Sequence, residues 1–178
     1  KRILHGFVGL YVWIFRGTPM MVQALIIYHG LRPILNWSPV TAGITIISIN
    51  TGAYMAEIIR AGIQSIDKGQ NEAARSLGMT STQTMMSIIL PQAIRNSFPS
   101  IGNEFIVNIK DSSMLNVIGV IELYFQSSSV AGSLMLYVPT FIVAAILYLL
   151  LTTLATQLLS FVEGRMNMPK MSGPSSQS

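Results

Sequence analysis

The chain has 178 residues, of which 51% are hydrophobic and only 10% are charged. A soluble globular domain carries about 25% charged residues, so this composition excludes that class and predicts an integral membrane protein. The formal net charge is +4, but the basic residues form no dense run, which argues against a nucleic-acid partner. The absence of cysteine excludes disulfides and thiolate metal sites, and two isolated histidines make no metal-binding pattern.

Two apolar stretches lie before residue 36. Residues 3–15 mix basic and aromatic side chains, and we expect an interfacial helix or the end of an earlier membrane span. Residues 19–35 predict a span of their own, because Thr18 can cap a helix and Pro19 suits the first helical turn.

Residues 40–59 predict the next span, which Pro39 opens and Arg60 closes. Small residues recur every four positions along it and share one face, at Ser48, Gly52 and Ala56. This face indicates either an internal interface, where another helix approaches closely, or the general tolerance of membrane helices for small residues.

A polar segment, residues 65–91, separates this span from the next apolar region, and its second part reads EAARSLGMTSTQTMMSIILP from residue 72. A short helix is expected over residues 71–77, with a small apolar face and a sharp exit at Gly78. Such a helix can fill a groove on another protein. The alternative is an ordinary amphipathic helix with a glycine cap, which gives no role to the downstream Ile88 and Pro91.

This segment resembles the cytoplasmic EAA loop of ATP-binding-cassette (ABC) importer permeases, in which a short helix docks into a separate ATPase. Residues 16–23, RGTPMMVQ, and residues 110–113, KDSS, are similar to segments of polar amino acid permeases of the glutamine and histidine type. The resemblance covers about residues 16–165. It implies an all-α, polytopic integral membrane fold, the type I importer permease, and it implies that the family's first membrane helix would precede Lys1.

The resemblance also implies which residues carry function. The docking residues would be Glu72, Ala73, Ala74, Leu77 and Gly78. The stretch that contains Lys110 and Asp111 lines the central path in the resembling family.

The apolar region after the loop is the least regular. We expect Pro91 and Pro99 to interrupt it and leave a broken helix over residues 98–109 that faces the transport pathway, because irregular backbone at membrane depth needs protein or a wet cavity beside it.

Ionisable groups within a span cost free energy and usually face a cavity. The pathway candidates are therefore Glu57, Glu104, Lys110, Asp111 and, as a hydroxyl donor, Ser112.

Two of these candidates have competing interpretations. Lys110 and Asp111, as neighbouring opposite charges, could bind the two ends of a zwitterion, or they could neutralise each other or lie among the outer headgroups. Glu57 could instead be a structural partner of Arg60, three residues on.

The last third ends in the clearest span. Residues 116–125 predict a short amphipathic segment with Glu122 exposed, and residues 127–133 predict a polar turn. Residues 134–162 contain no charge and exceed the roughly 20 residues that a crossing needs. We expect a permease domain over residues 1–165 and a flexible tail over residues 166–178.

Positive charge in the short loops predicts the orientation. In this layout one side of the membrane carries Lys1, Arg2, Arg16, Arg60, Lys68, Arg75, Arg95, Arg165 and Lys170, and the other clearly carries only Arg32. The EAA loop and the C-terminus are therefore expected in the cytoplasm, with the protein in the cell membrane.

The sequence has no phosphate-binding loop and no nucleophile elbow, so no cofactor and no enzymatic activity are expected on this chain. By resemblance, ATP and Mg²⁺ belong to partner ABC ATPase subunits. The resemblance also implies a second permease subunit, identical or homologous, and an extracytoplasmic binding protein or fused domain that delivers a polar amino acid such as glutamine. The alternatives are an ion channel or ion-coupled carrier, which would use the intramembrane charges as a relay, and a structural scaffold.

Overall fold

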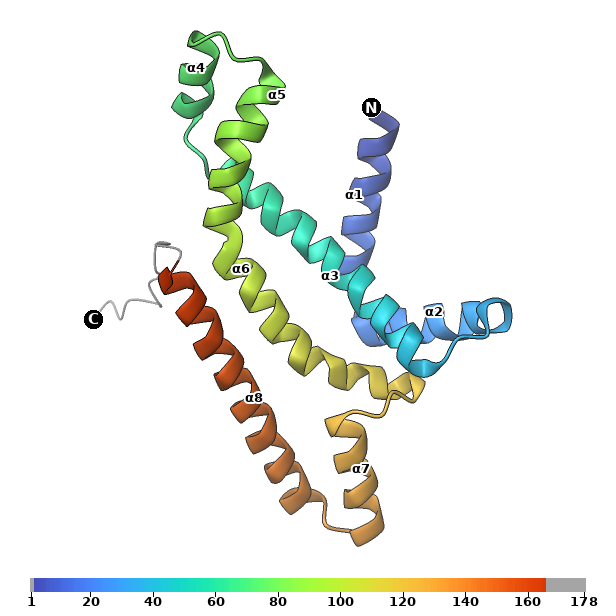
Figure 1. Ribbon diagram of the computed structural model, residues 1–178. Helices are drawn as coiled ribbons and strands as arrows, with labels where there is room; N and C mark the ends of the chain where they lie inside the picture. Colours follow the sequence, from blue (N-terminus) through green and yellow to red (C-terminus); the bar gives the residue numbers. More distant parts are fainter. Residues whose placement is uncertain (1, 166–178) are drawn as a thin grey trace, which may run out of the picture.

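The computed structural model describes residues 2–165, with side chains from residue 6 onward, and the regular elements of this part are all helices, joined by short turns (Figure 1). The predicted tail, residues 166–178, lies outside it. The elements are α1 (Arg2–Gly17), α2 (Met20–Leu35), α3 (Pro39–Gln64), α4 (Lys68–Ser76), α5 (Ser81–Thr84), the π-helical segment η1 (Met85–Ile89), α6 (Leu90–Asp111), the 3-10 segment η2 (Ser112–Ile118), α7 (Leu123–Leu134) and α8 (Tyr137–Arg165).

Within residues 2–165, two helices are long and apolar enough to cross a membrane by themselves, α3 with 26 residues and α8 with 29. Both exceed the roughly 20 residues that a hydrocarbon core of about 30 Å requires. The Ser38 hydroxyl accepts a hydrogen bond from the Thr41 amide at 3.2 Å, and Pro39 occupies the first turn of α3. The prediction of a span over residues 40–59 is confirmed. The span predicted over residues 134–162 is confirmed as a helix that begins later, at Tyr137, because Leu134 ends α7.

The prediction of a separate span over residues 19–35 is wrong, because α2 has only 16 residues. Residues 6–35 reach the length and apolarity of a span only as the pair α1 and α2, which bends by 113°. Thr18 does not cap α2 either. Its hydroxyl donates back to the Ile14 carbonyl oxygen at 2.8 Å, and Pro19 is the residue that precedes the helix.

The helix α3 lies at the centre of the molecule and packs against α1, α2, α6 and η2. At the end where α2 and η2 meet it, a small apolar core forms. Its buried members are Met20, Ala24, Tyr28, Ala42, Ile46, Leu115 and Ile118. This core fixes the end of the bundle that lies away from α4 and α5 (Figure 1).

The expected break over residues 98–109 is absent, because α6 continues from Leu90 to Asp111 with Pro99 buried inside it. Proline removes one helical hydrogen bond and bends a helix, but a helix packed between neighbours can tolerate that loss. Figure 1 shows α6 changing direction along its length while it runs between α3 and α8. The irregular backbone lies instead at the two ends of α6, in η1 and η2.

The helices α7 and α8 form a hairpin at the end opposite α4. The predicted turn over residues 127–133 is wrong, because the hydroxyls of Ser127 and Ser133 donate to carbonyls of α7 itself. The chain turns at Met135, whose φ is 57°.

Glu122 was predicted to be exposed, but it is half-buried. Its carboxylate accepts from the Tyr124 and Phe125 amides at the start of α7 and from the Tyr148 hydroxyl of α8 at 2.8 Å.

Candidate functional site

The EAA segment forms an arm that projects beyond the long helices, with α4 as one leg and α5 with η1 as the other (Figure 1). The Asp67 carboxylate starts α4 by accepting from the Gly69 amide at 2.7 Å. Thr80 and Gln83 form a reciprocal capping box that starts α5. The sequence therefore prescribes both legs locally, through residues at the two N-termini.

The arm turns at Gly78, as the sequence predicted. This residue has φ of 81°, and the flanking amides close the helix end, Gly78 to the Arg75 carbonyl at 3.0 Å and Met79 to the Ala74 carbonyl at 3.2 Å. These two bonds are the Schellman pattern, which needs a left-handed residue at this position. A glycine adopts that backbone without steric cost.

The five predicted docking residues lie in the second half of α4 and at this turn, but they do not share one face. Ala74 is buried within the arm, whereas Glu72, Ala73, Leu77 and Gly78 are exposed. Leu77 is 84% exposed, an unusual position for a leucine that ends a polar helix. The predicted apolar face is therefore divided, because Ala74 packs inward while Ala73 and Leu77 face outward.

The arm buries few apolar side chains. Between residues 65 and 91 only Ala74 and Ile89 are buried apolar residues. Beneath α4 lies a hollow of about 500 Å³ whose lining includes Lys68, Asn71 and Arg75. Helix caps and local hydrogen bonds therefore hold the shape of the arm, which has no apolar core of its own.

The arm joins the spans where α3 and α6 cross closely. A Cβ atom on Gly62 would overlap the Ser97 hydroxyl and would lie 2.9 Å from the Ala93 carbonyl oxygen. Ser97 donates to the Ile58 carbonyl at 3.3 Å, and Asn96 donates to the Ser65 hydroxyl at 3.3 Å. Because α3 leads into α4 and α6 leads out of the arm, this crossing ties both legs to the membrane helices.

Three of the polar residues of α6 recur on one side of the helix, at Glu104, Asn108 and Asp111, spaced by four and three positions. The Asn108 amide exchanges hydrogen bonds with the Thr51 hydroxyl of α3 at 2.9 and 3.1 Å. Glu104 and Asp111 are half-buried. This side of α6 is therefore a polar face, and its middle residue, Asn108, contacts α3.

Lys110 faces elsewhere. It is exposed and lines a hollow of about 500 Å³ beside α8, together with Ser113, Tyr148 and Thr152. Among the described side chains, Lys110 and Asp111 form no ion pair, because consecutive helical residues point about 100° apart. The Ser112 hydroxyl donates to the Ile109 carbonyl at 2.8 Å, where α6 passes into η2.

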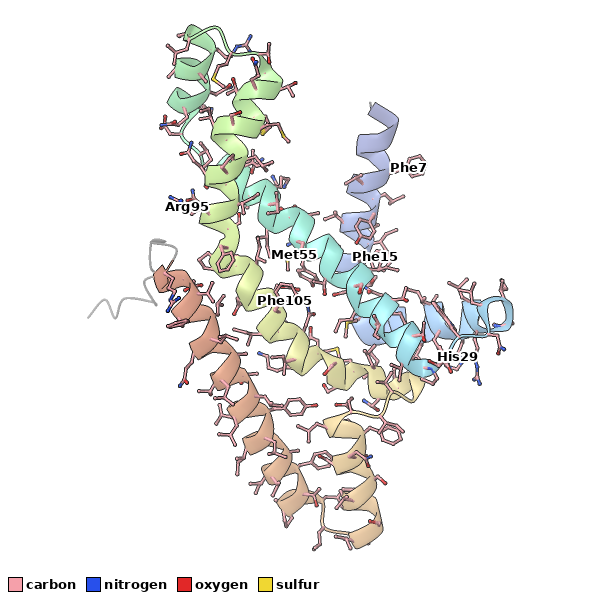
Figure 2. The ribbon with its side chains drawn as sticks, viewed as in Figure 1. Phe7, Phe15, His29, Met55, Arg95 and Phe105 are labelled. Carbon is pink, nitrogen blue, oxygen red and sulfur yellow. The ribbon has the colours of Figure 1, made fainter. Side chains whose placement is uncertain are left out.

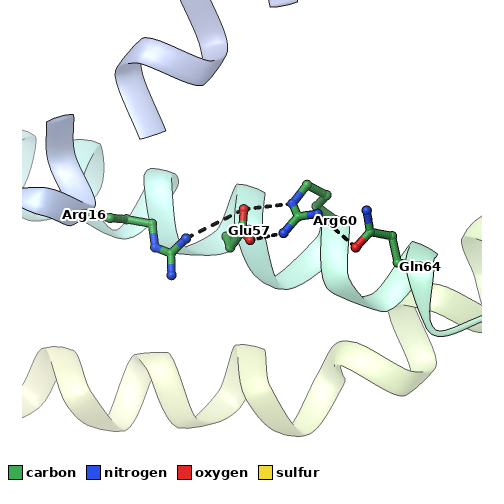
Figure 3. Close-up of polar contacts among 4 residues, drawn as sticks. All are labelled: Arg16, Glu57, Arg60 and Gln64. Atoms are coloured by element: carbon green, nitrogen blue, oxygen red, sulfur yellow. Dashed lines mark hydrogen bonds and ion pairs between the residues drawn. The ribbon is translucent and has the colours of Figure 1, made fainter. Parts of the chain in front are cut away.

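Glu57 lies between two arginines, as Figure 3 shows. Its carboxylate accepts from Nε of Arg60 at 2.9 Å and also contacts the terminal nitrogen of that guanidinium, which confirms the predicted pairing with Arg60. The Arg16 guanidinium of α1 lies 3.7 Å away on the other side. Arg60 also donates to Gln64 at 2.9 Å. The pair with Arg16, which links α1 to α3, was not predicted.

A second unpredicted polar cluster holds the bend between α1 and α2. Gln23 and Asn50 are both buried, and the Asn50 amide donates to the Gln23 carbonyl oxygen at 2.9 Å. The Gln23 amide donates in turn to the Phe15 and Thr18 carbonyls at 2.9 Å. The sequence did contain a signal for this cluster, because Gln23 and Asn50 are uncharged amides inside apolar stretches. Such groups must find hydrogen-bond partners in the membrane interior.

No group of three histidine, aspartate or glutamate side chains within residues 6–165 is arranged to hold a metal ion.

The family model described as "Binding-protein-dependent transport system inner membrane component" matches residues 1–168. The chain belongs to this family. It is accordingly a membrane permease subunit of the ABC transporter class, as the EAA segment and the helical fold indicated.

Individual relatives of the chain are permeases and transporters of the same class. The chain is 40% identical over 171 residues to the probable amino-acid permease protein YxeN of Bacillus subtilis, covering 94% of this chain and 76% of that one. It is 38% identical over 160 residues to the glutamine transport system permease protein GlnP of Escherichia coli, covering 88% and 73%. The crystal structure of an amino acid ABC transporter with histidines is 46% identical, with a TM-score of 0.82, and the match covers 88% of this chain and 74% of that chain.

Proposed function

We propose that this permease is the membrane-spanning subunit of an ATP-driven importer for polar amino acids such as glutamine. In this proposal partner ABC ATPases bind the arm from the cytoplasm and supply ATP and Mg²⁺. A second permease subunit, identical or homologous, completes the pathway, and an extracytoplasmic binding protein or fused domain delivers the substrate. Relatives named as amino-acid and glutamine permeases support the substrate class.

The observation that carries the proposal is the exposed turn at Leu77 and Gly78. A leucine side chain that is 84% exposed beyond the spans has a cost in water that a partner groove would remove. The shortage of buried apolar residues in the arm supports the same conclusion, because a docked ATPase would supply the missing contacts. An ion channel or ion-coupled carrier has no use for such an arm.

The crossing of α3 and α6 supports a coupling route. ATPase closure would displace α4, and the close packing at Gly62 would pass that displacement to both helices instead of letting the arm bend alone. The polar face of α6 would move with it, so closure would expose the path outward and reopening would expose it inward. The route therefore needs no flexible linker between arm and pathway.

The polar face of α6 supports a substrate role for Glu104 and Asp111, whose carboxylates suit the ammonium group of an amino acid. Lys110 would meet the substrate carboxylate only from the α8 side, so in this proposal it contacts a different part of the path from Asp111. The Arg16 and Arg60 contacts give Glu57 a structural task at the α1–α3 contact, and its pathway role remains a secondary proposal.

The orientation is part of the proposal. The basic residues of the loops next to the arm support a cytoplasmic arm and C-terminal end.

Co-purification of the ATPase with the full-length permease tests the dock. Gly78→Asp places a carboxylate at the exposed turn, and we expect the bound ATPase and ATP-dependent uptake to fall at least about tenfold, the scale of one interfacial hot spot. Gly78→Asn is the matched control, since asparagine tolerates the left-handed backbone and carries no charge; it should retain the ATPase.

Lys110→Ala and Asp111→Ala separate transport from docking. Both variants are expected to keep the ATPase bound while amino acid uptake falls. Normal uptake in both would remove these residues from the pathway, and normal ATPase binding in Gly78→Asp would contradict the dock.

A further inference from the structure

An apolar groove of about 310 Å³ runs between α6 and α8, on the side of α6 away from its contact with α3. Phe98, Phe105 and Ile109 of α6 face Ala155 and Val162 of α8 across it, and its whole lining is apolar. The helices α6 and α8 pack against each other and run antiparallel, as Figure 1 shows. The groove therefore has one end near Phe98 and Val162 and the other near Ile109 and Ala155.

The length of the groove matches one leaflet of a bilayer. Residues 98 and 109 are eleven positions apart, which is about 16 Å along an α-helix at 1.5 Å per residue. Half of a hydrocarbon core of about 30 Å is about 15 Å. An acyl chain that lies in this groove would extend from the membrane surface to about the bilayer midplane.

The floor of the groove is closed by direct contact between the two helices. A Cβ atom on Gly102 would overlap the Leu159 side chain, so α6 and α8 touch there. The hollow is therefore a crease along a helix pair. A single extended hydrocarbon chain can lie lengthwise in such a crease.

Two arginines lie at the same end of the groove. Arg95 is three residues before Phe98 on α6, and Arg165 is three residues after Val162 on α8, so each is one turn beyond the lining on the same helix face. Figure 2 shows Arg95 on the flank of α6, on the side where α8 ends.

Both arginines are exposed, and neither forms an ion pair with the described side chains. Arg165 instead stacks over the Phe161 ring at 4.7 Å. Two guanidinium groups at the mouth of an apolar crease can bind a phosphate group, which suits their planar donor geometry.

We infer that this groove binds an anionic phospholipid, with one acyl chain along α6 and α8 and the phosphate between Arg95 and Arg165. The inference rests on the proposed function only in naming the cytoplasmic leaflet, because the arginines lie on the arm side of the molecule. The lipid would bridge the ends of α6 and α8 next to the arm.

The test uses the full-length permease in its purified complex, washed in mild detergent, with phosphatidylglycerol and phosphatidylethanolamine extracted and counted by mass spectrometry. Wild type is expected to retain phosphatidylglycerol preferentially. Arg95→Gln and Arg165→Gln should each lower its retention about fivefold, the effect of one basic side chain near an anionic surface. The Arg95→Lys variant should recover most of the lipid.

Three controls keep the test specific. Arg32→Gln, a basic residue outside the groove, should leave the retained lipid unchanged. Ala155→Phe fills the groove and should displace the lipid, whereas Leu150→Phe, on an exposed part of α8, should not. ATPase co-purification should stay at the wild-type level in every variant, so failure of this inference is distinguishable from failure of the dock.

Two results would overturn the inference. Wild-type complex that retains no more phosphatidylglycerol than phosphatidylethanolamine would show that the arginines select no anionic lipid. Equal retention in wild type and in the double variant Arg95→Gln with Arg165→Gln would show that the lipid binds elsewhere.

Discussion

The helices α3 and α8 are both long enough to cross a membrane, yet they occupy opposite environments. The helix α3 packs against α1, α2 and α6, and six of its residues are buried. Within the described residues the main contacts of α8 are with α6 and α7, and Ala144 is its one buried residue. Length and apolarity therefore predict that a helix crosses, but they do not say whether it lies inside the bundle or on its perimeter.

Polar side chains distinguish the two helices. Those of α3 reach across to other elements, as Asn50 does to Gln23 and Thr51 does to Asn108. Those of α8 mostly bond within the helix, as Thr152 and Thr156 do to carbonyls one turn earlier. A polar group with a partner on another helix marks the interior, because lipid cannot supply that partner.

The largest expected effect on stability comes from the closest contact of α3. In Gly62→Ala the new methyl group meets the Ala93 carbonyl oxygen, a backbone atom that cannot turn away. We expect a loss of about 1–3 kcal/mol in the free energy of unfolding, measured in detergent, as overpacking typically costs.

Gly102→Ala is the matched change on the α8 side. There the new methyl group meets the flexible Leu159 side chain, and we expect a smaller loss. Equal losses in the two variants would mean that the α6–α8 contact is as rigid as the α3–α6 contact.

The next effect is expected at the amide cluster. Asn50→Ala leaves the Gln23 carbonyl oxygen without its donor inside the bundle, and a loss of about 1–2 kcal/mol in unfolding free energy should follow. Gln157→Ala, on the exposed surface of α8, should change the same quantity by less than about 0.5 kcal/mol. A larger effect at Gln157 would contradict the perimeter position of α8.

The smallest expected effect concerns the one hydrogen bond by which α8 reaches another element in the described part of the chain. Tyr148→Phe removes the hydroxyl that donates to Glu122 at 2.8 Å. Glu122 still caps α7 by accepting from the Tyr124 and Phe125 amides. Interhelical hydrogen bonds in membrane proteins are worth about 0.6 kcal/mol on average. A thermal unfolding midpoint equal to wild type within error would mean that this bond adds nothing.

The sequence predicted much of this architecture for identifiable reasons. Apolar length predicted α3 and α8, the glycine at position 78 predicted the turn of the arm, and three-residue spacing predicted the Glu57–Arg60 pair. Each of these depends on local chemistry, which a single sequence contains.

The failures depend on tertiary contacts. Pro99 was expected to break α6, but packing between α3 and α8 holds the helix together. Ser127 and Ser133 suggested a turn, but their hydroxyls bond within α7, so a polar composition was misread as irregular backbone. The Arg16–Glu57 and Gln23–Asn50 contacts join residues 41 and 27 positions apart, a relation that no local pattern reveals.

A single cysteine at the arm tests the central claim most directly. The chain has no cysteine, so Ala73→Cys provides one reactive thiol at the exposed face of α4. The account predicts that a membrane-impermeant thiol reagent labels this residue in inside-out vesicles but not in intact cells, and that bound ATPase blocks the labelling. Labelling from the outside of intact cells, or labelling that the ATPase leaves unchanged, would contradict it.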